Sequence, residues 1–380
     1  MRILHTSDWH LGKRLFKLDR SPEHELFLNW LLSILREEKI DVLLIAGDIF
    51  DTPTPPHQSL EVFYNFLHRV STETTTDTYI IAGNHDSGLL LEAPARLLSF
   101  HRVKIWGKLS TEIKDHWINI TKGKESIDLC ALPFFRSYEL LPQGEGDALA
   151  VLKTYLEPQS KNPSILMLHH LAGVFEAAGS EQVISLSGVD SIPTEVMDRF
   201  DYVALGHIHK PQKVGKKSYY SGSPIPMRFS ETQRKSVMII DVKDSEFEIK
   251  THQIPVFRDL FIVKADESTY LAKLKELIPS TELKGMVEVQ LNLAAPRIGL
   301  IDEIKEVLDK KGLELLSFLP FYAAKDDAPK KHEKLFELSP LELFQEFYAT
   351  KFPEEKEVPE DLKADFTELL EKVKHAPHSS

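Results

Sequence analysis

The sequence predicts an α/β sandwich followed by a small α+β domain and C-terminal helices. Five short aliphatic runs recur in the first two thirds of the chain, and unbroken runs of this kind are typical of strands buried on both faces. Amphipathic helical patterns lie between some of these runs, which indicates strand–helix alternation. The chain has 380 residues, 42% of them hydrophobic, which favours a globular protein with more than one domain.

The first domain, residues 1–254, is expected to carry the functional site. Its strands are expected at Ile3–Leu4, Val42–Ala46, Tyr79–Ala82, Ile165–Leu168 and Tyr202–Leu205. Helices are expected at Glu23–Glu38 and Ser59–Val70, where apolar residues recur at spacings of three and four. Ligands of such sheets gather at the carboxyl ends of the strands, so we expect the site there.

The second domain, residues 255–322, has the pattern of a small α+β unit without a cluster of ligand-type residues. Its alternating strands and helices are expected at Asp259–Lys264, Ser268–Leu277, Met286–Leu293, Ile298–Lys311 and Leu313–Leu319. Gly312 is expected to stop the second helix.

The third region, residues 323–380, reads as a charged linker followed by two amphipathic helices. The first helix is expected to start at Ser339, because a capping serine is followed by Pro340 and by Glu342 at the third position. The second is expected at Asp361–Lys374. Two short helices have no core of their own, so they either pack back onto this chain or dock on a partner protein. We favour the partner.

Cysteine content and hydropathy indicate the cellular compartment in which the protein is expected. The only cysteine, Cys130, lies in an apolar run and is expected to be a small buried hydrophobe, so neither an internal disulfide nor a thiolate metal cage can form. The first apolar run does not resemble a signal peptide, and no run approaches the roughly 18–20 apolar residues that span a bilayer. We therefore expect a cytoplasmic protein.

The charge balance argues weakly against a stand-alone DNA-binding protein. The chain has 46 basic and 58 acidic residues, a net charge of −12, whereas such proteins are usually basic. The tail is distinctly acidic, however, and basic residues cluster between Lys13 and Arg20 and between Lys210 and Lys217. The local electrostatic field around a site matters more than the net charge of the chain. Bound cations would also neutralise phosphate at the point of contact.

Polar, metal-capable residues follow each of the five expected strands. The clusters are Asp8-Trp9-His10, Gly47-Asp48-Ile49-Phe50-Asp51, Gly83-Asn84-His85-Asp86, His169-His170 and Gly206-His207-Ile208-His209. Each is a weak signal alone, and we expect the histidines outside them to be ordinary solvated or hydrogen-bonded side chains. Five clusters at five strand ends would meet in one cleft.

The residue types in this cleft indicate a two-metal phosphoesterase. Carboxylate, imidazole and amide ligands without thiolate suit Mn²⁺, Fe or Zn²⁺, and oxygen-rich sites favour Mn²⁺. The candidate ligands exceed what one ion needs: Asp8, His10, Asp48, Asn84, His169, His207 and His209. They fit two ions about 3.5–4 Å apart that share one carboxylate. We expect the glycines before Asp48, Asn84 and His207 to turn the backbone sharply off the strands.

At these residues the chain resembles a known superfamily. The series D-x-H, G-D-x-x-D, G-N-H-D, a lone H and G-H-x-H is similar to the signature of calcineurin-like metallophosphoesterases. The segments that narrow the resemblance to SbcD-like bacterial nucleases are Asp8–Gly12, Ala204–His209 and Tyr220–Pro226. The resemblance implies a four-layer α/β sandwich and a Mn²⁺-dependent DNA nuclease. It would combine double-strand exonuclease with single-strand endonuclease activity in DNA repair, recombination and replication.

The resemblance also implies a role for each matching residue. The first metal would be held by Asp8, His10 and His209, the second by Asn84, His169 and His207, with Asp48 bridging. His85 would face the scissile phosphate as the catalytic residue rather than as a ligand, and Asp86 would orient it.

Two of these matches need a choice or depart from the pattern. At His169-His170 we choose His169 as the ligand, because two-residue alternation turns His170 to the opposite side of the strand. Archaeal and eukaryotic relatives carry a catalytic histidine three residues after the bridging aspartate. This chain has Asp51 there, which puts a second catalytic histidine in doubt.

Partners follow from the resemblance as well. The small domain would cap the nuclease site, and the tail helices would bind a coiled-coil ATPase of the SbcC type. The chain would form a homodimer within a heterotetramer, although no stretch of the sequence shows a self-complementary face. The chain has no G-x-x-x-x-G-K-[ST] loop, so any ATP dependence must come from the second subunit.

Two other functions fit part of the pattern. A small-substrate phosphoesterase, for example a cyclic-nucleotide phosphodiesterase, would explain the ligands but not the extra domain and the tail helices. A non-catalytic scaffold of the same fold would typically have lost ligands or the residue at His85, and all of them are present here.

Overall fold

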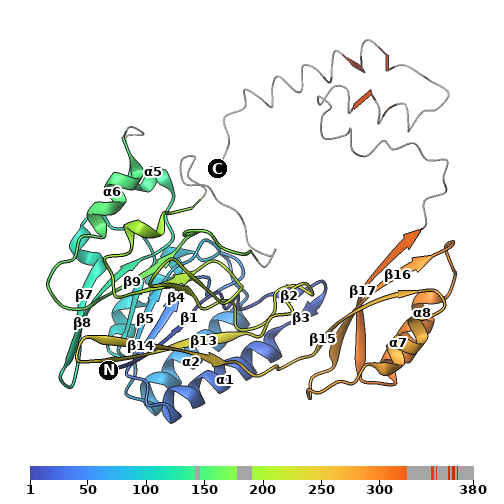
Figure 1. Ribbon diagram of the computed structural model, residues 1–380, viewed down its shortest axis with the longest axis horizontal. Helices are drawn as coiled ribbons and strands as arrows, with labels where there is room; N and C mark the ends of the chain where they lie inside the picture. The colour runs from blue at the N-terminus through green and yellow to red at the C-terminus, as the bar shows by residue number, and fades with distance from the viewer. Residues whose placement is uncertain are drawn as a thin grey trace. The chain divides into compact units, whose positions relative to one another are not determined.

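The computed structural model describes residues 1–141, 146–177 and 191–322, together with single positions in the tail. The chain divides into two compact units, Met1–Phe321 and Tyr322–Ser380. Two six-stranded sheets and one three-stranded sheet belong to the first unit (Figure 1). No helix among these residues is both long and apolar enough to cross a membrane.

The first sheet has the strand order β14-β13-β1-β4-β5-β6. Its strands are β1 (Arg2–Thr6), β4 (Val42–Ala46), β5 (Asp77–Ile81), β6 (Val103–Trp106), β13 (Ser236–Lys243) and β14 (Glu246–Gln253). The four strands β1, β4, β5 and β6 run parallel, whereas β13 is antiparallel to β1 and β14 to β13. Their parallel arrangement brings the ends of β1, β4 and β5 to one edge.

The second sheet has the order β11-β12-β10-β9-β8-β7. Its strands are β7 (Trp117–Lys122), β8 (Glu125–Leu132), β9 (Ser164–His169), β10 (Tyr202–Gly206), β11 (Gln212–Val214) and β12 (Ser218–Tyr220). The strands β8, β9, β10 and β12 are parallel, and only the edge strands β7 and β11 are antiparallel to their neighbours.

The two sheets pack face to face between layers of helices. Alternate side chains of β4 show this: Val42, Leu44 and Ala46 belong to a core shared with β8, β9 and β10, whereas Leu43 and Ile45 belong to a core shared with two helices. Those helices are α1 (Ser21–Glu37) and α2 (His57–Glu73). A third core lies on the outer face of the second sheet. The predicted four-layer α/β sandwich is confirmed.

The remaining short elements connect the strands. They are β2 (Arg14–Leu15), β3 (Leu18–Asp19), α3 (Gly88–Glu92), α4 (Ala95–Ser99), α5 (Ser137–Leu140), α6 (Ala148–Tyr155) and the 3₁₀ turns Ile113–His116 and Thr194–Val196. Cys130 of β8 is fully buried, as predicted.

The five predicted strands of the first domain all exist, and further strands that were not predicted lie among them. Strands β6, β7 and β8 lie between β5 and β9, and the strands from β11 to β14 were not predicted. For edge strands such as β14 the physical reason is that they are half exposed, so they lack the unbroken apolar runs of central strands; this reason does not apply to β8 and β13, which are central and mostly buried. The exposed and half-exposed residues of β14 illustrate this pattern.

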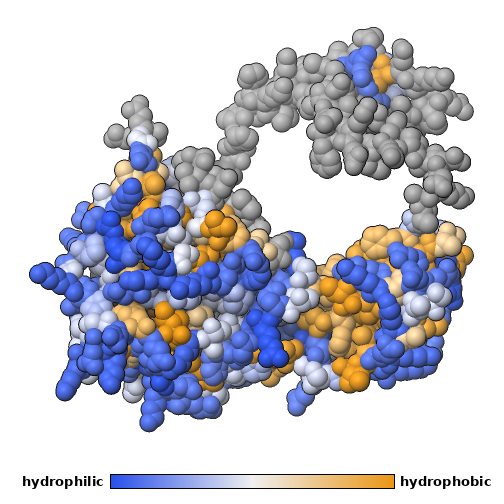
Figure 2. Space-filling view, in the orientation of Figure 1, coloured by the Kyte–Doolittle hydropathy of each residue, from blue (hydrophilic) through white to orange (hydrophobic). Residues whose placement is uncertain are grey.

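The small domain has the predicted element order β15-α7-β16-α8-β17. Its elements are β15 (Leu260–Asp266), α7 (Tyr270–Glu276), β16 (Gly285–Leu293), α8 (Leu300–Asp309) and β17 (Leu313–Tyr322). The sheet order is β15-β16-β17, and one sheet face packs on the two helices. Hydrophobic side chains also lie on the surface of this domain (Figure 2), among them Ile278, Ile298 and Phe321. The domain boundaries stay a prediction.

The predicted tail helices lie almost entirely outside the described residues. Phe344, Tyr348, Leu362 and Phe366 are described and are helical. The rings of Phe344 and Phe366 are stacked with centroids 4.1 Å apart, so the two predicted helices contact one another within the second unit.

Candidate metal centre

The seven predicted ligands lie just after, or at the end of, five parallel strands. Asp8 and His10 follow β1, Asp48 follows β4, Asn84 follows β5, His169 ends β9, and His207 and His209 follow β10. Six of the seven, all except Asn84, are buried. The carboxyl ends of strands from both sheets therefore converge, as the ligand pattern predicts.

Four of these residues have left-handed backbones. The φ angles are 55° at Asp8, 48° at His10, 51° at Asp48 and 99° at His207. Non-glycine residues rarely adopt such angles, and residues that do so cluster at functional sites. The turns aim the side chains away from the strands and toward one another.

The glycines before three of the ligands have two different roles. Gly47 has a φ of 86° and makes the sharp turn that the sequence predicts. Gly83 and Gly206 do not have a positive φ, so their backbone angles do not require glycine. They are required for close approach instead: a Cβ on Gly206 would lie 1.8 Å from the carbonyl oxygen of Ala46, in the neighbouring sheet.

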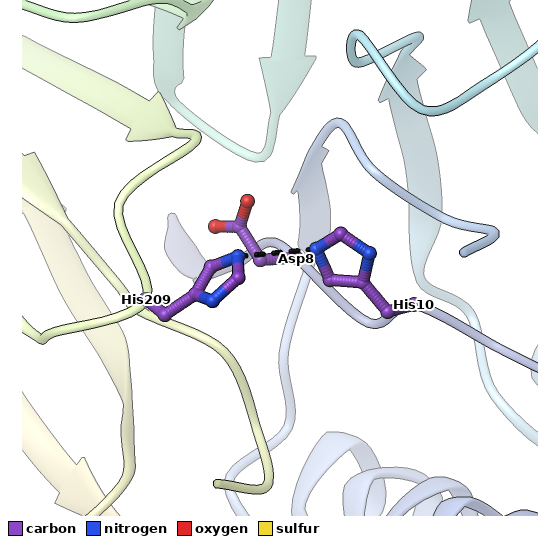
Figure 3. Close-up of side chains that lie close together, drawn as sticks. All are labelled: Asp8, His10 and His209. Atoms are coloured by element: carbon purple, nitrogen blue, oxygen red, sulfur yellow. Dashed lines mark hydrogen bonds between the residues drawn. The ribbon is translucent and has the colours of Figure 1, made fainter. Parts of the chain in front are cut away.

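The first group of converging ligand atoms consists of Asp8, His10 and His209. The Nε2 atoms of His10 and His209 face one another at 3.1 Å, and the carboxylate of Asp8 lies beside them (Figure 3). Asp8 is held by the backbone N–H of His207, which donates to its Oδ1 at 2.9 Å, and by the hydroxyl of Ser7.

The second group consists of Asp48, His169 and His207. The Oδ1 atom of Asn84 lies 3.1 Å from Nε2 of His169 and 2.8 Å from Nδ1 of His207, so the amide joins this group. The other nitrogen of His169, Nδ1, donates to the carbonyl oxygen of Ala46 at 2.8 Å. A carbonyl can only accept, so this bond leaves Nε2 as the ligand atom.

Asp48 lies between the two groups. Its Oδ2 atom is 3.5 Å from Nε2 of His10 and 3.4 Å from Nε2 of His169. Its Oδ1 atom accepts a hydrogen bond from the backbone N–H of His85 at 2.9 Å. Burial alone would raise the pKa of this carboxyl, but the neighbouring His169 lowers it well below its usual range, which keeps Asp48 ionised.

His85 stands at the edge of the first group without belonging to either set of ligands. Its ring lies edge-on to that of His10, with centroids 4.8 Å apart. Its Nδ1 donates to the backbone carbonyl of Asp51 at 2.8 Å, which leaves Nε2 to face a bound molecule. The ring is half-buried, so it remains accessible.

The expectation that Asp86 orients His85 is wrong. The two oxygens of Asp86 accept hydrogen bonds from the backbone N–H groups of Gly83, Ile49 and Phe50, at 2.8, 3.1 and 2.9 Å. Asp86 therefore ties the loop after β5 to the loop after β4. Burial, together with the charge of Asp48, raises its pKa to about 6.

The adjacent histidines His169 and His170 point to different places. His169 lies in the second group, whereas His170 stacks on Phe134 with ring centroids 4.9 Å apart and accepts from the backbone N–H of Phe135 at 3.2 Å. Burial lowers the pKa of His170 well below its ordinary value, so this ring is a neutral packing group.

Two family models match the chain. The model described as Calcineurin-like phosphoesterase matches residues 1–211, more than half of the sequence. The model described as Type 5 capsule protein repressor C-terminal domain matches residues 256–352, which include the small domain.

Several curated proteins named as the SbcD component of the nuclease SbcCD are similar to this chain. That of Escherichia coli K12 is 29% identical over 299 residues, covering 73% of this chain and 74% of its own. That of Rhodobacter capsulatus is 35% identical, covering 61% and 64%. That of Bacillus subtilis is 32% identical over 265 residues, covering 65% and 67%. This chain belongs to the SbcD family of calcineurin-like phosphoesterases.

The SbcD family assignment confirms the predicted class of enzyme. The chain is a metallophosphoesterase hydrolase of the SbcD nuclease type, with a dimetal site built from histidine and aspartate clusters. A solved dimetal phosphatase from Danio rerio is 11% identical with a TM-score of 0.44, covering 67% of this chain and 97% of that one. A likeness of that size carries no functional argument.

The sequence did not predict which residues lie behind the proposed ligands of this SbcD-family chain, although Asp51 belongs to one of the predicted clusters. The hydroxyl of Ser221 contacts that of Ser7 at 2.8 Å behind Asp8. Asp51 lies 3.4 Å from Nδ1 of His10 through its Oδ1, which also accepts from Lys13 at 2.9 Å. Glu231 lies 3.7 Å from Nδ1 of His209. The segment containing Ser221 marks the family resemblance, but no sequence pattern distinguishes Glu231.

The electrostatics of the second group place a proton on one histidine. Burial lowers the pKa of His169, but the adjacent Asp48 carboxylate outweighs it and raises that pKa to about 9. Burial and the positive His169 lower the pKa of His207 to about 4. A cation that enters this group would take the place of that proton.

Proposed function

We propose that this SbcD-family chain is a Mn²⁺-dependent, two-metal DNA nuclease subunit. The observation that carries the proposal is the position of Asp48. One of its oxygens lies 3.4–3.5 Å from a histidine nitrogen of each ligand group, which is the place of a carboxylate shared by two cations. A site for one ion would not need a carboxylate between two complete groups.

The ligands divide between two ions. The first ion would be held by Asp8, His10 and His209, and the second by Asn84, His169 and His207, with Asp48 bridging. His169 rather than His170 is the ligand in this proposal, because only His169 points its Nε2 into the group. Carboxylate, amide and imidazole donors without thiolate favour Mn²⁺.

When bound, the ions would supply a hydroxide near neutral pH and offset charge on the phosphate. The chain itself positions the other participants. His85, fixed through Nδ1, presents Nε2 beside the first group and would protonate the leaving oxygen or stabilise the charge that develops on the phosphate. Asp86 holds the loop that carries His85 against the loop that carries Asp48.

DNA is the substrate that the family favours, with double-strand exonuclease and single-strand endonuclease activity in repair, recombination and replication. The proteins similar to this chain are named as nuclease components. The small domain would cap the site and help to select DNA ends. A chromosomal substrate would place the protein in the cytoplasm.

We also propose that the chain works with an SbcC-type coiled-coil ATPase. Its relatives are named as one component of SbcCD, and the sequence has no P-loop of its own. The tail helices, which contact one another through Phe344 and Phe366, would be the dock.

A homodimer within a heterotetramer is supported by an apolar groove between α2, α3 and α4. The groove has a volume of about 560 Å³ and is lined mainly by leucines, including Leu60, Leu67 and Leu97. Leu89, Leu97 and Phe100 each expose more than 60% of their surface around it. Such an apolar patch on a globular protein indicates an interaction site, and a second copy of the chain is the occupant that we propose.

The test uses the purified full chain with Mn²⁺ and labelled single- and double-stranded DNA, with and without the ATPase partner and ATP. A cyclic nucleotide is the parallel substrate. Cleavage of DNA but not of the cyclic nucleotide is expected. Turnover of the cyclic nucleotide alone would favour the small-substrate phosphoesterase, and no turnover of either would favour the scaffold.

Asp48→Asn tests directly whether Asp48 bridges the two ions. The amide keeps the shape of the side chain and tolerates the left-handed backbone, but it lacks the charge that two cations share. Calorimetry should show that the variant does not take up two Mn²⁺ ions, and DNA cleavage should be lost. Uptake of two ions with unchanged affinity would contradict the bridging role.

A further inference from the structure

We infer that the buried pair Glu231 and Lys235 positions His209 for metal binding. The inference rests on the proposed function, because it takes His209 as a ligand of the first ion. The two residues expose only 3% and 6% of their surface, and they lie on the segment that precedes β13. None of the predicted roles involves either residue.

The side chain of His209 lies between the ion position and Glu231. Its Nε2 faces Nε2 of His10 at 3.1 Å, so this nitrogen points into the first ligand group. Its Nδ1 lies 3.7 Å from Oε1 of Glu231, on the opposite side of the ring. A carboxylate behind a metal-binding imidazole keeps the proton on the distant nitrogen, orients the ring and makes the ligand nitrogen more basic.

The two oxygens of Glu231 have different partners. Oε1 faces His209, whereas Oε2 accepts from Nζ of Lys235 at 2.5 Å. The carboxylate is therefore held between the ring of His209 on one side and the ammonium group of Lys235 on the other.

Lys235 extends the support from the side chain of His209 to its backbone. Its Nζ donates to the carbonyl oxygen of His209 at 3.0 Å and to the hydroxyl of Ser223 at 2.9 Å. The backbone N–H of Ser223 donates to the same carbonyl at 3.2 Å. These contacts hold both the side chain and the backbone carbonyl of His209.

The chain offers a matched control in another buried ion pair. Arg20 binds Glu23 through two nitrogens at 2.7 and 2.5 Å, and both residues are buried. Glu23 also contacts Arg258 at 3.0 Å, and these side-chain partners are not proposed ligands. Glu23→Gln therefore removes a buried carboxylate whose ion-pair partners are Arg20 and Arg258 rather than a proposed ligand.

The experiment measures Mn²⁺ binding to metal-free full-length protein by calorimetry and by electron paramagnetic resonance. Glu231→Gln should weaken the binding of one ion about 10–100-fold, the range for loss of a residue that supports a ligand. At the same Mn²⁺ concentration, the parent protein should give the resonance signal of a coupled ion pair, whereas Glu231→Gln should give that of a single ion. Glu23→Gln should change Mn²⁺ affinity less than twofold, although thermal unfolding should show that this variant is less stable.

The double variant Glu231→Gln/Lys235→Met separates positioning from folding. Removing both charges avoids an unpaired buried lysine, so the metal-free double variant should be more stable than Glu231→Gln alone. Its Mn²⁺ affinity should stay low. The inference is overturned if Glu231→Gln binds both ions as tightly as the parent protein, or if the double variant regains full affinity. Uptake of fewer than two ions by the parent protein would instead overturn the proposed function.

Discussion

At the scale of single residues, the metal centre consists of two layers. Four of the seven proposed ligands are presented from left-handed turns, and a second set of groups lies behind the imidazoles: Asp51 behind His10, Glu231 behind His209 and the carbonyl of Ala46 behind His169. The carbonyl of Ala46 accepts the Nδ1 proton of His169, whereas the carboxylates of Asp51 and Glu231 lie 3.4 and 3.7 Å from Nδ1 of their histidines, so each group faces the ring nitrogen that points away from the centre.

His85 allows chemistry to be separated from metal binding. We expect His85→Gln to lower the rate of DNA cleavage by at least about 100-fold, the contribution of a positioned acid or transition-state donor. Mn²⁺ uptake, measured by calorimetry, and DNA binding should stay within about threefold of the parent protein. Undiminished cleavage would exclude the proposed role.

A buried histidine outside the centre should make stability depend on pH. Burial lowers the pKa of His5 to about 3, and its Nδ1 lies 2.9 Å from the hydroxyl of Tyr202. The unfolded chain binds this proton near pH 6.5, whereas the folded chain does not until about pH 3. As the pH falls from about 6.5 to about 3, the free energy of unfolding should therefore decrease, by up to about 1.4 kcal/mol per pH unit for this one group.

Urea unfolding of metal-free His5→Phe and parent protein at pH 6 and pH 4.5 measures this contribution. The variant cannot take up the proton, so its loss of stability between the two pH values should be smaller than that of the parent protein. Equal losses would show that His5 is protonated in the folded protein.

At the scale of elements, strong periodicity predicted helices and strands well. The predicted strand Val42–Ala46 coincides with β4, and the five elements of the small domain all occur in the expected order. The irregular segments were not predictable in the same way. The hairpin of β2 and β3 is one example: its Leu15 packs with Phe229 and with Met286 of the small domain, a contact that depends on tertiary structure.

The groove between α2, α3 and α4 is an element-scale feature with a testable consequence. Leu97→Glu places a charge on a side chain that is 64% exposed, so the folded monomer should lose less than about 0.5 kcal/mol of stability. In the proposed homodimer the same charge would be buried without a partner. Sedimentation should show a dissociation constant at least about tenfold higher.

Ile278→Glu is the matched control, because Ile278 is an exposed apolar residue of the small domain, away from the groove residues. It should leave the dimer unchanged. A parent protein that is monomeric at all concentrations, or a dimer insensitive to Leu97→Glu, would contradict the proposed occupant.

At the scale of the whole molecule, catalysis and assembly are expected to reside in separate parts. The ligands and His85 all belong to the unit Met1–Phe321, whereas the predicted partner-binding helices belong to Tyr322–Ser380. Deletion of residues 334–380 should therefore leave Mn²⁺-dependent hydrolysis of simple phosphodiesters within about twofold.

The same deletion should abolish binding of the SbcC-type ATPase, measured by co-purification of the two proteins. Phe344→Ala/Phe366→Ala is a finer version, since it removes the ring contact between the two predicted helices. Co-purification of the truncated chain with the ATPase would show that the tail is not the dock.

The sequence by itself determined the chemistry of this protein. Aspartate, asparagine and histidine after aliphatic runs were enough to predict a cleft, a two-metal site and the family, because ligand type and strand position are local properties of the chain. Only the tertiary structure showed that Asp86 binds the backbones of two loops rather than His85, and that Glu231 lies behind His209. The supporting residues can be recognised only by their contacts in the folded protein. Residues that are far apart in the sequence become neighbours only when both sheets have packed.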